Sequence, residues 1–341
     1  MGKKNVTFSD IAKYTNFSKT TISRYFNNPD SLTLDNQQKI ADALVELDYK
    51  ENKVARILAN GKTEFVGIII PNLYLHYYAQ ILNQVLSTYE TFGYKFLVFV
   101  GNDKEDIERK YIQELLSYKI EGMIVLSNTI SSKELASYNI PIVTIEREDQ
   151  YICSVNSDNY MGAIQAISLL YKNGCDILIH MNADIDSSIP AYGRIQGFWD
   201  ICREHQMEHE LLLGNWGTNH KENIDKIQPV FEEIDQKYAN KRKGIFLSND
   251  TIANVFLNLL IRKYGTLPDD YRIISYDGSP VSSDAIIPFS TVGQQIEKIA
   301  YEAMELLVMQ IEERKKRKPV PLDTPIHKVI TPILIRRETT R

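Results

Sequence analysis

Cysteines are few in this sequence, and long hydrophobic runs are absent. The three cysteines, Cys153, Cys175 and Cys202, are odd in number and far apart, which argues against a disulfide framework or a metal cluster and favours a reducing cytosol. No apolar run approaches the roughly 18 residues that a membrane helix needs. The first residues lead into polar sequence where a signal peptide would have its apolar core. We therefore expect a soluble cytoplasmic protein that makes no contact with a membrane.

The signatures of common enzyme classes are also missing. The sequence has no Walker A loop, no glycine-rich dinucleotide fingerprint after its first strand and no Gly-x-Ser-x-Gly elbow. His205 and His209 are four residues apart on a helical pattern, but they lack the HExxH pattern, so we interpret them as a solvated helix end rather than a metal site. We expect no enzymatic activity, no cofactor and no bound metal.

Positive charge is scarce overall, because the 341 residues carry a net charge of −5. That balance by itself argues against a nucleic-acid binder. The charge is unevenly distributed, however: residues 1–62 hold 10 basic and 7 acidic residues, a charge of +3, which leaves −8 on the remainder. A basic head on an acidic body is typical of a protein in which only the head contacts a polyanion.

The head shows helical spacing and no strand pattern. Thr7 is the expected N-cap of a first helix, and Ser18 is the expected N-cap of a second helix over residues 19–27. In the tight turn between them, Asn16 can adopt the left-handed conformation at little cost. A third helix with one apolar stripe begins at Thr33. Three short helices with a tight turn between the first two predict a helix-turn-helix module.

One face of the second helix is entirely polar. At positions i, i+3, i+4 and i+7 it carries Thr20, Ser23, Arg24 and Asn27. Ile22 and Phe26 form the opposite, apolar pair, which is suited to packing on Ile11 and Tyr14. Such a helix fits the major groove of DNA, where an arginine can bind guanine O6 and N7 in bidentate fashion. An ordinary amphipathic surface helix is the alternative.

From residue 65 onward, short apolar runs alternate with longer helical patterns. The expected strands are residues 65–70, 96–100, 122–126, 142–145, 177–180, 244–247 and 271–275. The expected helices are residues 77–92, 105–118, 161–172, 195–205, 223–238 and 251–264. This alternation predicts an α/β fold of parallel sheets with helices on both faces. Because about 275 residues are many for one such sheet, we expect two similar lobes with a ligand-binding cleft at the C-terminal ends of their strands.

Short motifs are spread along both parts of the chain in a fixed order. In the head they are VTFSDIA (6–12), SKTTISR (18–24) and residues 48–56. In the core they are residues 66–71, 157–159, 194–198, 248–250, 276–278 and 333–337. This set resembles the lactose-repressor family of transcriptional regulators, which also includes the galactose and purine repressors, and looks most like sucrose- and ribose-type repressors of Gram-positive bacteria. The resemblance implies an N-terminal helix-turn-helix domain, a hinge helix and a two-lobed core like that of periplasmic sugar-binding proteins.

The resulting division of the chain has three parts. Residues 1–51 form the DNA-binding domain, residues 52–63 the hinge helix and linker, and residues 64–341 the effector-binding and dimerisation core. In the core, one lobe takes residues 64–160 and 291–322, and the other takes residues 161–290 and 323–341. The hinge favours a helix that ends at Gly61, but it is too short to be stable alone in water, so we expect it to order only with support.

The resemblance also assigns roles in DNA binding. Lys19, Thr20 and Arg24 match positions that read bases. The positions that contact the phosphate backbone are Thr7, Ser18, Thr21, Ser23 and Asn27. Leu58 matches the hinge leucine that such repressors insert into the minor groove, where an apolar wedge unstacks and kinks the duplex. Packing of the head on the core is the alternative role of Leu58.

In the core, the resemblance places an effector in the cleft. The matching residues are Tyr77, Tyr78, Glu146, Arg147, Arg194, Trp216, Asn249, Asp250, Asp277 and Gln294. Arg and carboxylate groups bind paired hydroxyls, and an aromatic face can stack on a sugar ring. Each position has a structural alternative: Asp250 as a helix N-cap, Trp216 as a core residue, and Arg194 with Asp277 as an ion pair. The segment Tyr74-Leu75-His76 replaces the common Ser-Asn-Pro of the family, so the rim of the cleft differs there.

These observations together predict a sequence-specific transcriptional repressor. Its partners would be double-stranded operator DNA, a second copy of the chain in a homodimer, and a small effector, a sugar or sugar phosphate, whose binding changes the affinity for DNA. One alternative keeps this architecture but has a purine-like co-repressor. Another is a cytosolic sugar-binding protein whose head has no regulatory role.

Overall fold

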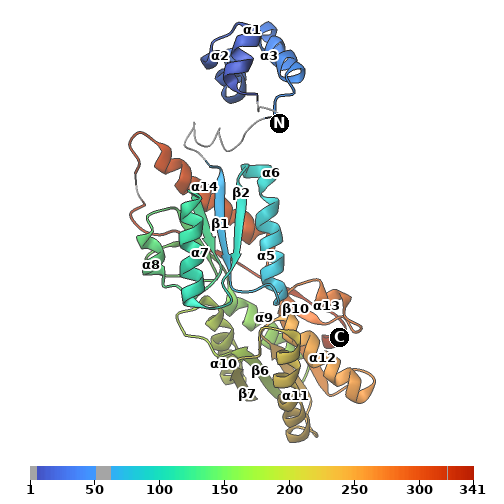
Figure 1. The fold of residues 1–341 in the computed structure, drawn as a ribbon. Coiled ribbons are helices and arrows are strands. Elements are labelled where there is room, and N and C mark those ends of the chain that lie inside the picture. Colours follow the sequence, from blue (N-terminus) through green and yellow to red (C-terminus); the bar gives the residue numbers. More distant parts are fainter. Residues whose placement is uncertain (1–5, 51–62, 321) are drawn as a thin grey trace. The chain divides into compact units, whose positions relative to one another are not determined.

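The computed structural model describes residues 6–50, 63–320 and 322–341 of the chain. The chain divides into two compact units, Met1–Lys62 and Thr63–Arg341 (Figure 1). The expected hinge helix and its Leu58 lie outside the described residues. Within the described part, no helix has the length and apolar character needed to span a membrane.

The first unit is the predicted three-helix head. Its helices are α1 (Phe8–Thr15), α2 (Lys19–Asn27) and α3 (Leu34–Glu46), and a short 3-10 turn, η1 (Pro29–Ser31), precedes α3. Ile11, Ile22 and Ile40, one from each helix, are fully buried and form its core. The expected packing on Tyr14 is wrong: Tyr14 is 55% exposed, and Phe26 stacks instead on Phe8 with 5.0 Å between the ring centroids.

The predicted caps begin the three helices. The carboxylate of Asp10 accepts hydrogen bonds from the Thr7 N–H and hydroxyl. Ser18 Oγ accepts a hydrogen bond from the backbone N–H of Thr21, the third residue of α2. Thr33 Oγ1 accepts one from the backbone N–H of Asn36, the third residue of α3. Asn16 lies in the left-handed region, with φ 56°. Local side-chain chemistry therefore sets where each helix of the head starts.

The second unit contains two six-stranded sheets, which confirms the predicted α/β fold. The first sheet consists of β1 (Phe65–Ile70), β2 (Lys95–Val100), β3 (Gly122–Val125), β4 (Ile142–Ile145), β5 (Cys153–Ser157) and β11 (His327–Ile330). The second consists of β6 (Ile177–Ala183), β7 (Glu208–Gly214), β8 (Lys243–Leu247), β9 (Tyr271–Asp277), β10 (Ser290–Gly293) and β12 (Ile333–Ile335). The strand orders are β11-β5-β4-β3-β1-β2 and β12-β10-β9-β8-β6-β7. Neighbouring strands are parallel, except that β12 runs antiparallel to β10.

Helices cover both faces of each sheet. Around the first sheet lie α5 (His76–Ser87), α6 (Tyr89–Phe92), α7 (Glu105–Ser117), α8 (Ser132–Ser137) and α14 (Ile296–Lys315). Around the second lie α9 (Asn159–Lys172), α10 (Gly193–Glu204), α11 (His220–Lys237), α12 (Asp250–Tyr264) and α13 (Val281–Asp284). β1 is apolar along its length because Val66 and Ile68 pack with α5 and α14, whereas Ile69 packs with α7 and α8.

The points where the chain passes between the lobes differ from those expected. Ser290–Gly293 pairs in the second sheet, and His327–Ile330 pairs with β5 in the first sheet. The first lobe therefore takes α14 and β11, and the expected boundaries at residues 291 and 323 were misplaced. Both strands are short and carry polar residues, so their membership depends on pairing partners far away in the sequence and not on a local pattern.

One local expectation also changes. His209 lies on β7 and not on a helix, so it and His205 do not share one helix face. The three cysteines are free and buried, and burial raises the pKa of Cys175 to about 11 and that of Cys202 to about 12. These thiols are therefore protonated at neutral pH and inert as nucleophiles.

Candidate functional site

Helix α2 presents an exposed polar face in the head. Lys19, Thr20 and Arg24 are exposed, and within the described part of the chain their side chains form no hydrogen bond or ion pair. On the opposite side, Ile22 is fully buried and Phe26 packs on the core of the head. The base-reading residues of the prediction therefore share one face that is open to a partner.

Of the residues expected to contact phosphates, Thr7 is the N-cap of α1, and the other four lie at the start of α2 and along it. Ser18 Oγ accepts a hydrogen bond from the Thr21 N–H at 3.1 Å and lies 2.9 Å from Thr21 Oγ1. Asn27 Nδ2 donates to Ser23 Oγ at 3.1 Å. These hydroxyl and amide groups already stabilise the helix. Because helix N-termini and hydroxyls also bind phosphate, the two roles are compatible.

The predicted effector residues follow strands of both sheets. Tyr77 and Tyr78 lie at the start of α5 after β1, Glu146 and Arg147 after β4, Trp216 after β7, Asn249 and Asp250 after β8, Asp277 at the end of β9, Gln294 after β10, and Arg194 at the start of α10. Hydrogen bonds join several of them into networks that connect the two lobes.

The first network joins Glu146 of the first lobe to Arg194 of the second lobe. Glu146 accepts from the Ser157 N–H at 2.6 Å and from Asn159 Nδ2 at 2.7 Å. The other end of the same amide, Asn159 Oδ1, accepts from Arg194 Nε at 2.8 Å. Burial raises the pKa of Glu146, and the positive charge of Arg194 acts against that rise. Glu146 and Arg194 are therefore connected through one amide side chain.

Arg194 is buried and is held by neutral groups. Its NH1 donates to the Ser248 carbonyl at 2.6 Å, and its guanidinium lies 3.7 Å from the centroid of the Tyr276 ring. Tyr276 fits there because residue 162 is glycine: a Cβ at Gly162 would lie 2.7 Å from the Tyr276 phenol. No ion pair joins Arg194 to Asp277, both of which are described, so the ion-pair alternative does not explain the position of Arg194. Part of its donor set is left for a ligand.

The second network joins the lobes through Gln294. Gln294 Nε2 donates to Asp277 Oδ1 at 2.9 Å, and Gln294 Oε1 accepts from the Ser157 hydroxyl at 2.5 Å. Asp277 therefore hydrogen-bonds, through one amide, to the end of β5 in the first lobe. Its backbone has φ 111°, a value that non-glycine residues rarely adopt and that is found at strained functional positions.

The environment of Asp277 favours the protonated form of its carboxyl group. Burial first, and then the nearby charge of Asp250, raise its pKa to about 8, although Arg194 and the hydrogen bond from Gln294 act in the opposite direction. A protonated carboxyl group can donate as well as accept a hydrogen bond. Asp277 therefore suits a ligand hydroxyl, which also does both.

Tyr77 and Tyr78 form the aromatic part of the site. Their ring centroids are 5.4 Å apart in an edge-to-face arrangement. Burial raises the pKa of Tyr77 well above its usual range, and the charges of Glu146 and Asp277 add to that rise. Tyr77 Oη is buried and has no hydrogen-bond partner in the described part of the chain. A buried hydroxyl without a partner is costly unless a water or ligand satisfies it.

Asn249 and Asp250 do not have the roles that the sequence indicates. Asn249, and not Asp250, is the N-cap of α12, because its Oδ1 accepts from the Ile252 N–H at 2.9 Å. Asp250 is fully buried, and its carboxylate accepts from three hydroxyls and one backbone N–H, which belong to Ser275, Thr291 and Ser279. The protein itself therefore satisfies the carboxylate of Asp250, which joins the segments that carry Ser275, Ser279 and Thr291.

Arg147 and Trp216 are both tied to the backbone. The Arg147 guanidinium donates to the carbonyls of Ser127, Asn128 and Ile130, so it fixes the loop after β3. Trp216 is buried in the core of the second lobe, and its Nε1 donates to the Asn182 carbonyl at 2.8 Å. The core alternative for Trp216 therefore has direct support.

The unusual rim segment also bridges the lobes. Tyr74 Oη donates to Asn223 Oδ1 of α11 at 2.9 Å, and the His76 N–H donates to Thr251 Oγ1 of α12 at 3.2 Å. Asn223 is fully buried, and its Nδ2 donates to the carbonyl of Trp216. The substitution that distinguishes this rim from the common family pattern thus supplies a contact that keeps the two lobes together.

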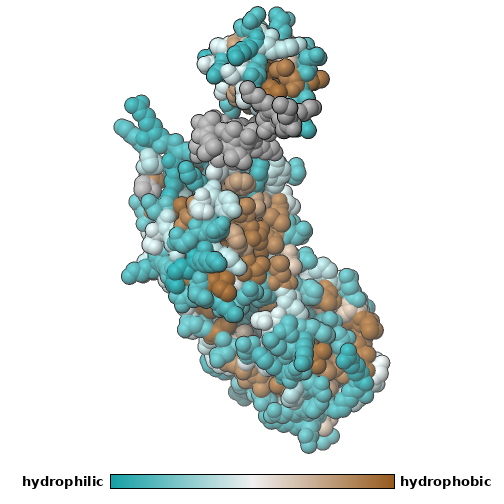
Figure 2. Space-filling model, viewed as in Figure 1, coloured by the Kyte–Doolittle hydropathy of each residue, from teal (hydrophilic) through white to brown (hydrophobic). Residues whose placement is uncertain are grey.

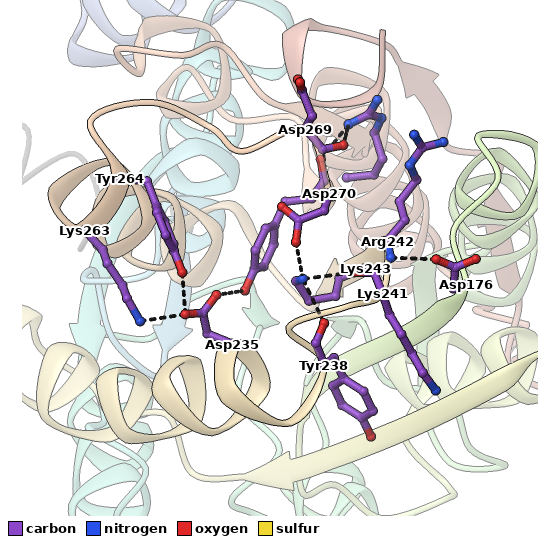
Figure 3. Close-up of polar contacts among 12 residues, drawn as sticks. Asp176, Asp235, Tyr238, Lys241, Arg242, Lys243, Lys263, Tyr264, Asp269 and Asp270 are labelled. Carbon is purple, nitrogen blue, oxygen red and sulfur yellow. Dashed lines mark hydrogen bonds and ion pairs between the residues drawn. The ribbon is translucent and has the colours of Figure 1, made fainter.

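A separate polar cluster lies at the opposite edge of the second sheet, where β8 and β9 begin (Figure 3). Asp235 accepts from Lys263, Tyr264 and Tyr271. The fully buried Lys243 is paired with Asp270 and also donates to two backbone carbonyls. An open cavity of about 730 Å³ lies beside them. Because the charges satisfy one another, we interpret this cluster as structural.

Comparison with known families places the chain. Residues 7–52 match the family described as bacterial regulatory proteins, lacI family. Residues 63–226 match the periplasmic binding proteins and sugar binding domain of the LacI family, and residues 169–340, half of the chain, match the periplasmic binding protein-like domain. The chain belongs to the lacI family. It is therefore a DNA-binding transcriptional repressor with a core of the sugar-binding type.

Relatives of this lacI-family repressor extend over its full length. It is 27% identical to the ribose operon repressor of Halalkalibacterium halodurans, with 98% of this chain and 97% of that protein covered. The lac repressor dimer bound to operator and an anti-inducer has the same fold, with a TM-score of 0.82, 20% identity and 99% of both chains covered. A LacI regulator from Alkaliphilus metalliredigens, solved with D-xylulofuranose, has a TM-score of 0.71 and 25% identity over 82% of this chain and 99% of that one.

Sequence reasoning missed the residues that connect the predicted ones. Asn159 and Ser157 belong to a motif that supported the family resemblance, yet no role was expected for either. Asn223 and the hydroxyl partners of Asp250 gave no signal, because a single Asn, Ser or Thr is common on any surface. The one available signal was that Ser157 and Asn159 belong to the motif at residues 157–159.

Proposed function

We propose that this lacI-family repressor binds a small carbohydrate between its two lobes and changes its affinity for operator DNA in response. The observation that carries the proposal is the amide-bridged network of Glu146, Asn159 and Arg194, which joins the two lobes at the ends of their strands. A ligand that inserts between these groups would change how the lobes are held together. Such a ligand shifts the protein between states only by its difference in affinity for them.

The chemistry of the site fits a hydroxyl-rich ligand. Glu146 supplies acceptors, Arg194 supplies donors, and Asp277 supplies both at neutral pH. Tyr77 and Tyr78 add aromatic surface, which suits the C–H face of a sugar ring. The proposed function is binding and requires no catalytic step. Because the target is operator DNA, we place the protein in the cytoplasm.

On the DNA side, we infer that α2 enters the major groove, with Lys19, Thr20 and Arg24 toward the bases. Thr7, Ser18, Thr21, Ser23 and Asn27 would then position the head on the phosphate backbone, and Leu58 would act as the minor-groove wedge. Two heads reading two half-sites would require a dimer.

An apolar surface supports the homodimer. β2 is an edge strand of the first sheet, and its six residues are all half-buried, although five of them are apolar. Figure 2 shows apolar side chains gathered on this face of the first lobe, over β2 and the neighbouring part of α5. Long, exposed, apolar edge strands are normally covered by another element or chain. We propose that a second copy of the chain covers this one.

Thermal unfolding of the purified protein against neutral sugars, sugar phosphates and purines tests the effector class. A ligand present at about 100 times its dissociation constant should add roughly 2.7 kcal/mol to the free energy of unfolding. A rise in the unfolding midpoint with one carbohydrate, and none with purines, supports the proposal. A response to purines alone would replace the sugar with a purine-like co-repressor.

A further inference from the structure

The titratable groups around the network that joins the two lobes are predominantly acidic. Glu146 and Asp277 both act on the phenol of Tyr78, as does Asp103, and each raises its pKa after burial itself. Arg194 is the cation that acts in the opposite direction. Asp250 adds a further buried carboxylate that interacts with Asp277. One guanidinium therefore faces several carboxyl groups.

The other nearby cation, Arg147, does not offset this excess of carboxyl groups. Arg147 follows Glu146 directly in the sequence, but its guanidinium is held by the backbone carbonyls of the loop after β3. Within the described residues, no lysine joins the hydrogen bonds around Glu146, Arg194 and Asp277. A phosphate group in the cleft would thus find one partly used arginine and the carboxylate of Glu146 together.

The unused donors and acceptors of these residues suit an uncharged ligand with hydroxyl groups better than a phosphate. Each Glu146 oxygen accepts one hydrogen bond from the protein and keeps capacity for another, and Arg194 keeps unused N–H groups. The buried Tyr77 hydroxyl has no partner among the described residues. Hydroxyl groups, which donate and accept, can satisfy all three sites, whereas a phosphate offers acceptors alone to Glu146.

We propose that the cleft selects an uncharged, polyhydroxylated sugar and excludes its phosphate ester, with Glu146 as the residue that sets this specificity. The inference rests on the proposed sugar-responsive function and narrows it. A phosphate placed beside the half-buried carboxylate of Glu146 is penalised by like-charge repulsion. We therefore expect an ester to bind at least about 100-fold more weakly than its parent sugar.

The test compares matched pairs by isothermal titration calorimetry on the full chain. The pairs are ribose with ribose 5-phosphate, fructose with fructose 1-phosphate and fructose 6-phosphate, xylulose with xylulose 5-phosphate, and sucrose with sucrose 6-phosphate; inorganic phosphate is added alone. The expected result is that one neutral sugar binds and its own ester binds at least about 100-fold more weakly. An ester that binds as tightly as its parent sugar, or an ester that binds while every neutral sugar fails, overturns the inference and leaves the sugar-responsive function in place. If no sugar or ester binds, the inference falls together with the proposed carbohydrate effector.

A pair of variants assigns the selectivity to Glu146. Glu146→Gln should narrow the ratio between sugar and ester affinities at least about tenfold, because the negative charge is removed while the shape is kept. Glu148→Gln removes the same charge from an exposed residue two positions away and should leave the ratio unchanged. Equal ratios in wild type and Glu146→Gln would overturn the role of Glu146. If Glu146→Gln does not fold, the comparison of sugar with ester on the wild-type protein still decides the selectivity.

Discussion

At the scale of residues, the site is built from charged groups held by neutral ones. Arg194 is buried and forms no ion pair among the described residues; it is held instead by Asn159, the Ser248 carbonyl and the Tyr276 ring. Its remaining N–H groups are available to a ligand. A ligand that supplies hydroxyl oxygens completes the set.

Asp277 provides a prediction about pH. Its folded-state pKa of about 8 lies above the ordinary value of 3.8, so the folded protein holds a proton that the unfolded chain has lost between about pH 4 and 8. The stability contributed by this residue therefore falls as pH rises through that window, by about 1 kcal/mol per pH unit. In Asp277→Asn this fall is removed, so the unfolding midpoint of the variant, relative to wild type, should rise with pH up to about 8 and then level off.

Thermal unfolding of both proteins between pH 5 and 9 checks this expectation. The control is Asp284→Asn, the same change at an exposed residue of α13, which should not alter the pH profile. A constant difference between Asp277→Asn and wild type at every pH would contradict the raised pKa of Asp277.

Arg24 provides a prediction about DNA. Arg24→Ala should weaken binding to a selected operator by about 1–3 kcal/mol and relax the preference at one base pair, because a bidentate contact to a base carries sequence information. Lys39→Ala removes the same charge from α3, where Lys39 already pairs with Asp35, and should cost little. Binding affinities measured by fluorescence anisotropy on the operator and on single-base variants give the result. An unchanged base preference in Arg24→Ala would rule out the assigned contact.

How far the sequence predicts the site depends on how each residue acts. Arg194 and Asp277 were predictable as polar residues in recognisable motifs. Their actual connections were not, because they pass through Asn159 and Gln294 from distant parts of the chain. Asp250 has the position of a helix cap, yet Asn249 takes that role, since two adjacent capping residues look alike in a sequence.

At the scale of elements, local patterns predicted most of the helices and apolar strands, but they did not predict α14 or β7. β1 and β4 coincide with their expected ranges, because short runs rich in Val and Ile mark a strand that is buried on both faces. β5, with the sequence CSVNS, gave no such signal, and β10, β11 and β12 are only three or four residues long. Their strand character comes from pairing with neighbours distant in the sequence, which no local pattern encodes.

The rim segment provides a prediction about the closed cleft. Tyr74→Phe removes the hydrogen bond between the lobes and leaves the buried Asn223 carbonyl oxygen without that donor. We expect the free energy of unfolding to fall by about 1–2 kcal/mol and the affinity for the sugar to fall about fivefold, because the closed arrangement is less favoured.

The control for Tyr74→Phe is Tyr264→Phe, which removes a tyrosine hydrogen bond to Asp235 inside the second lobe. It should lower stability without changing sugar affinity. Chemical denaturation and calorimetry give both quantities. An equal effect of the two variants on sugar affinity would show that Tyr74 acts through general stability and not through the contact between lobes.

At the scale of the whole molecule, the chain consists of two units with separate cores. The head holds its own cluster of buried side chains, and the core holds separate clusters in each lobe. Communication between sugar and DNA must therefore be a coupling free energy between two sites. Such a coupling is reciprocal: if the sugar weakens DNA binding by some factor, DNA weakens sugar binding by the same factor.

The proposed dimer gives a prediction at this scale. Leu86 is 38% exposed near the end of α5, the helix that carries part of the apolar surface. Leu86→Glu should turn the dimer into a monomer and reduce operator affinity at least about tenfold, since one head then binds one half-site. Tyr118→Glu, at a residue 51% exposed beyond the end of α7 on the other helical layer, is the control. Light scattering coupled to size-exclusion chromatography gives the masses, and a dimer of unchanged strength in Leu86→Glu would move the interface elsewhere.

The central claim is that a sugar in the core controls sequence-specific DNA binding by the head. The most direct measurement is the affinity of the full chain for a duplex selected from a random pool, measured by fluorescence anisotropy with and without a saturating neutral sugar. Selection should enrich a near-palindromic site, and the sugar should change the affinity at least about tenfold, a coupling within the usual 1–3 kcal/mol. A failure to enrich any sequence, or an operator affinity that is the same at saturating sugar, would contradict this claim.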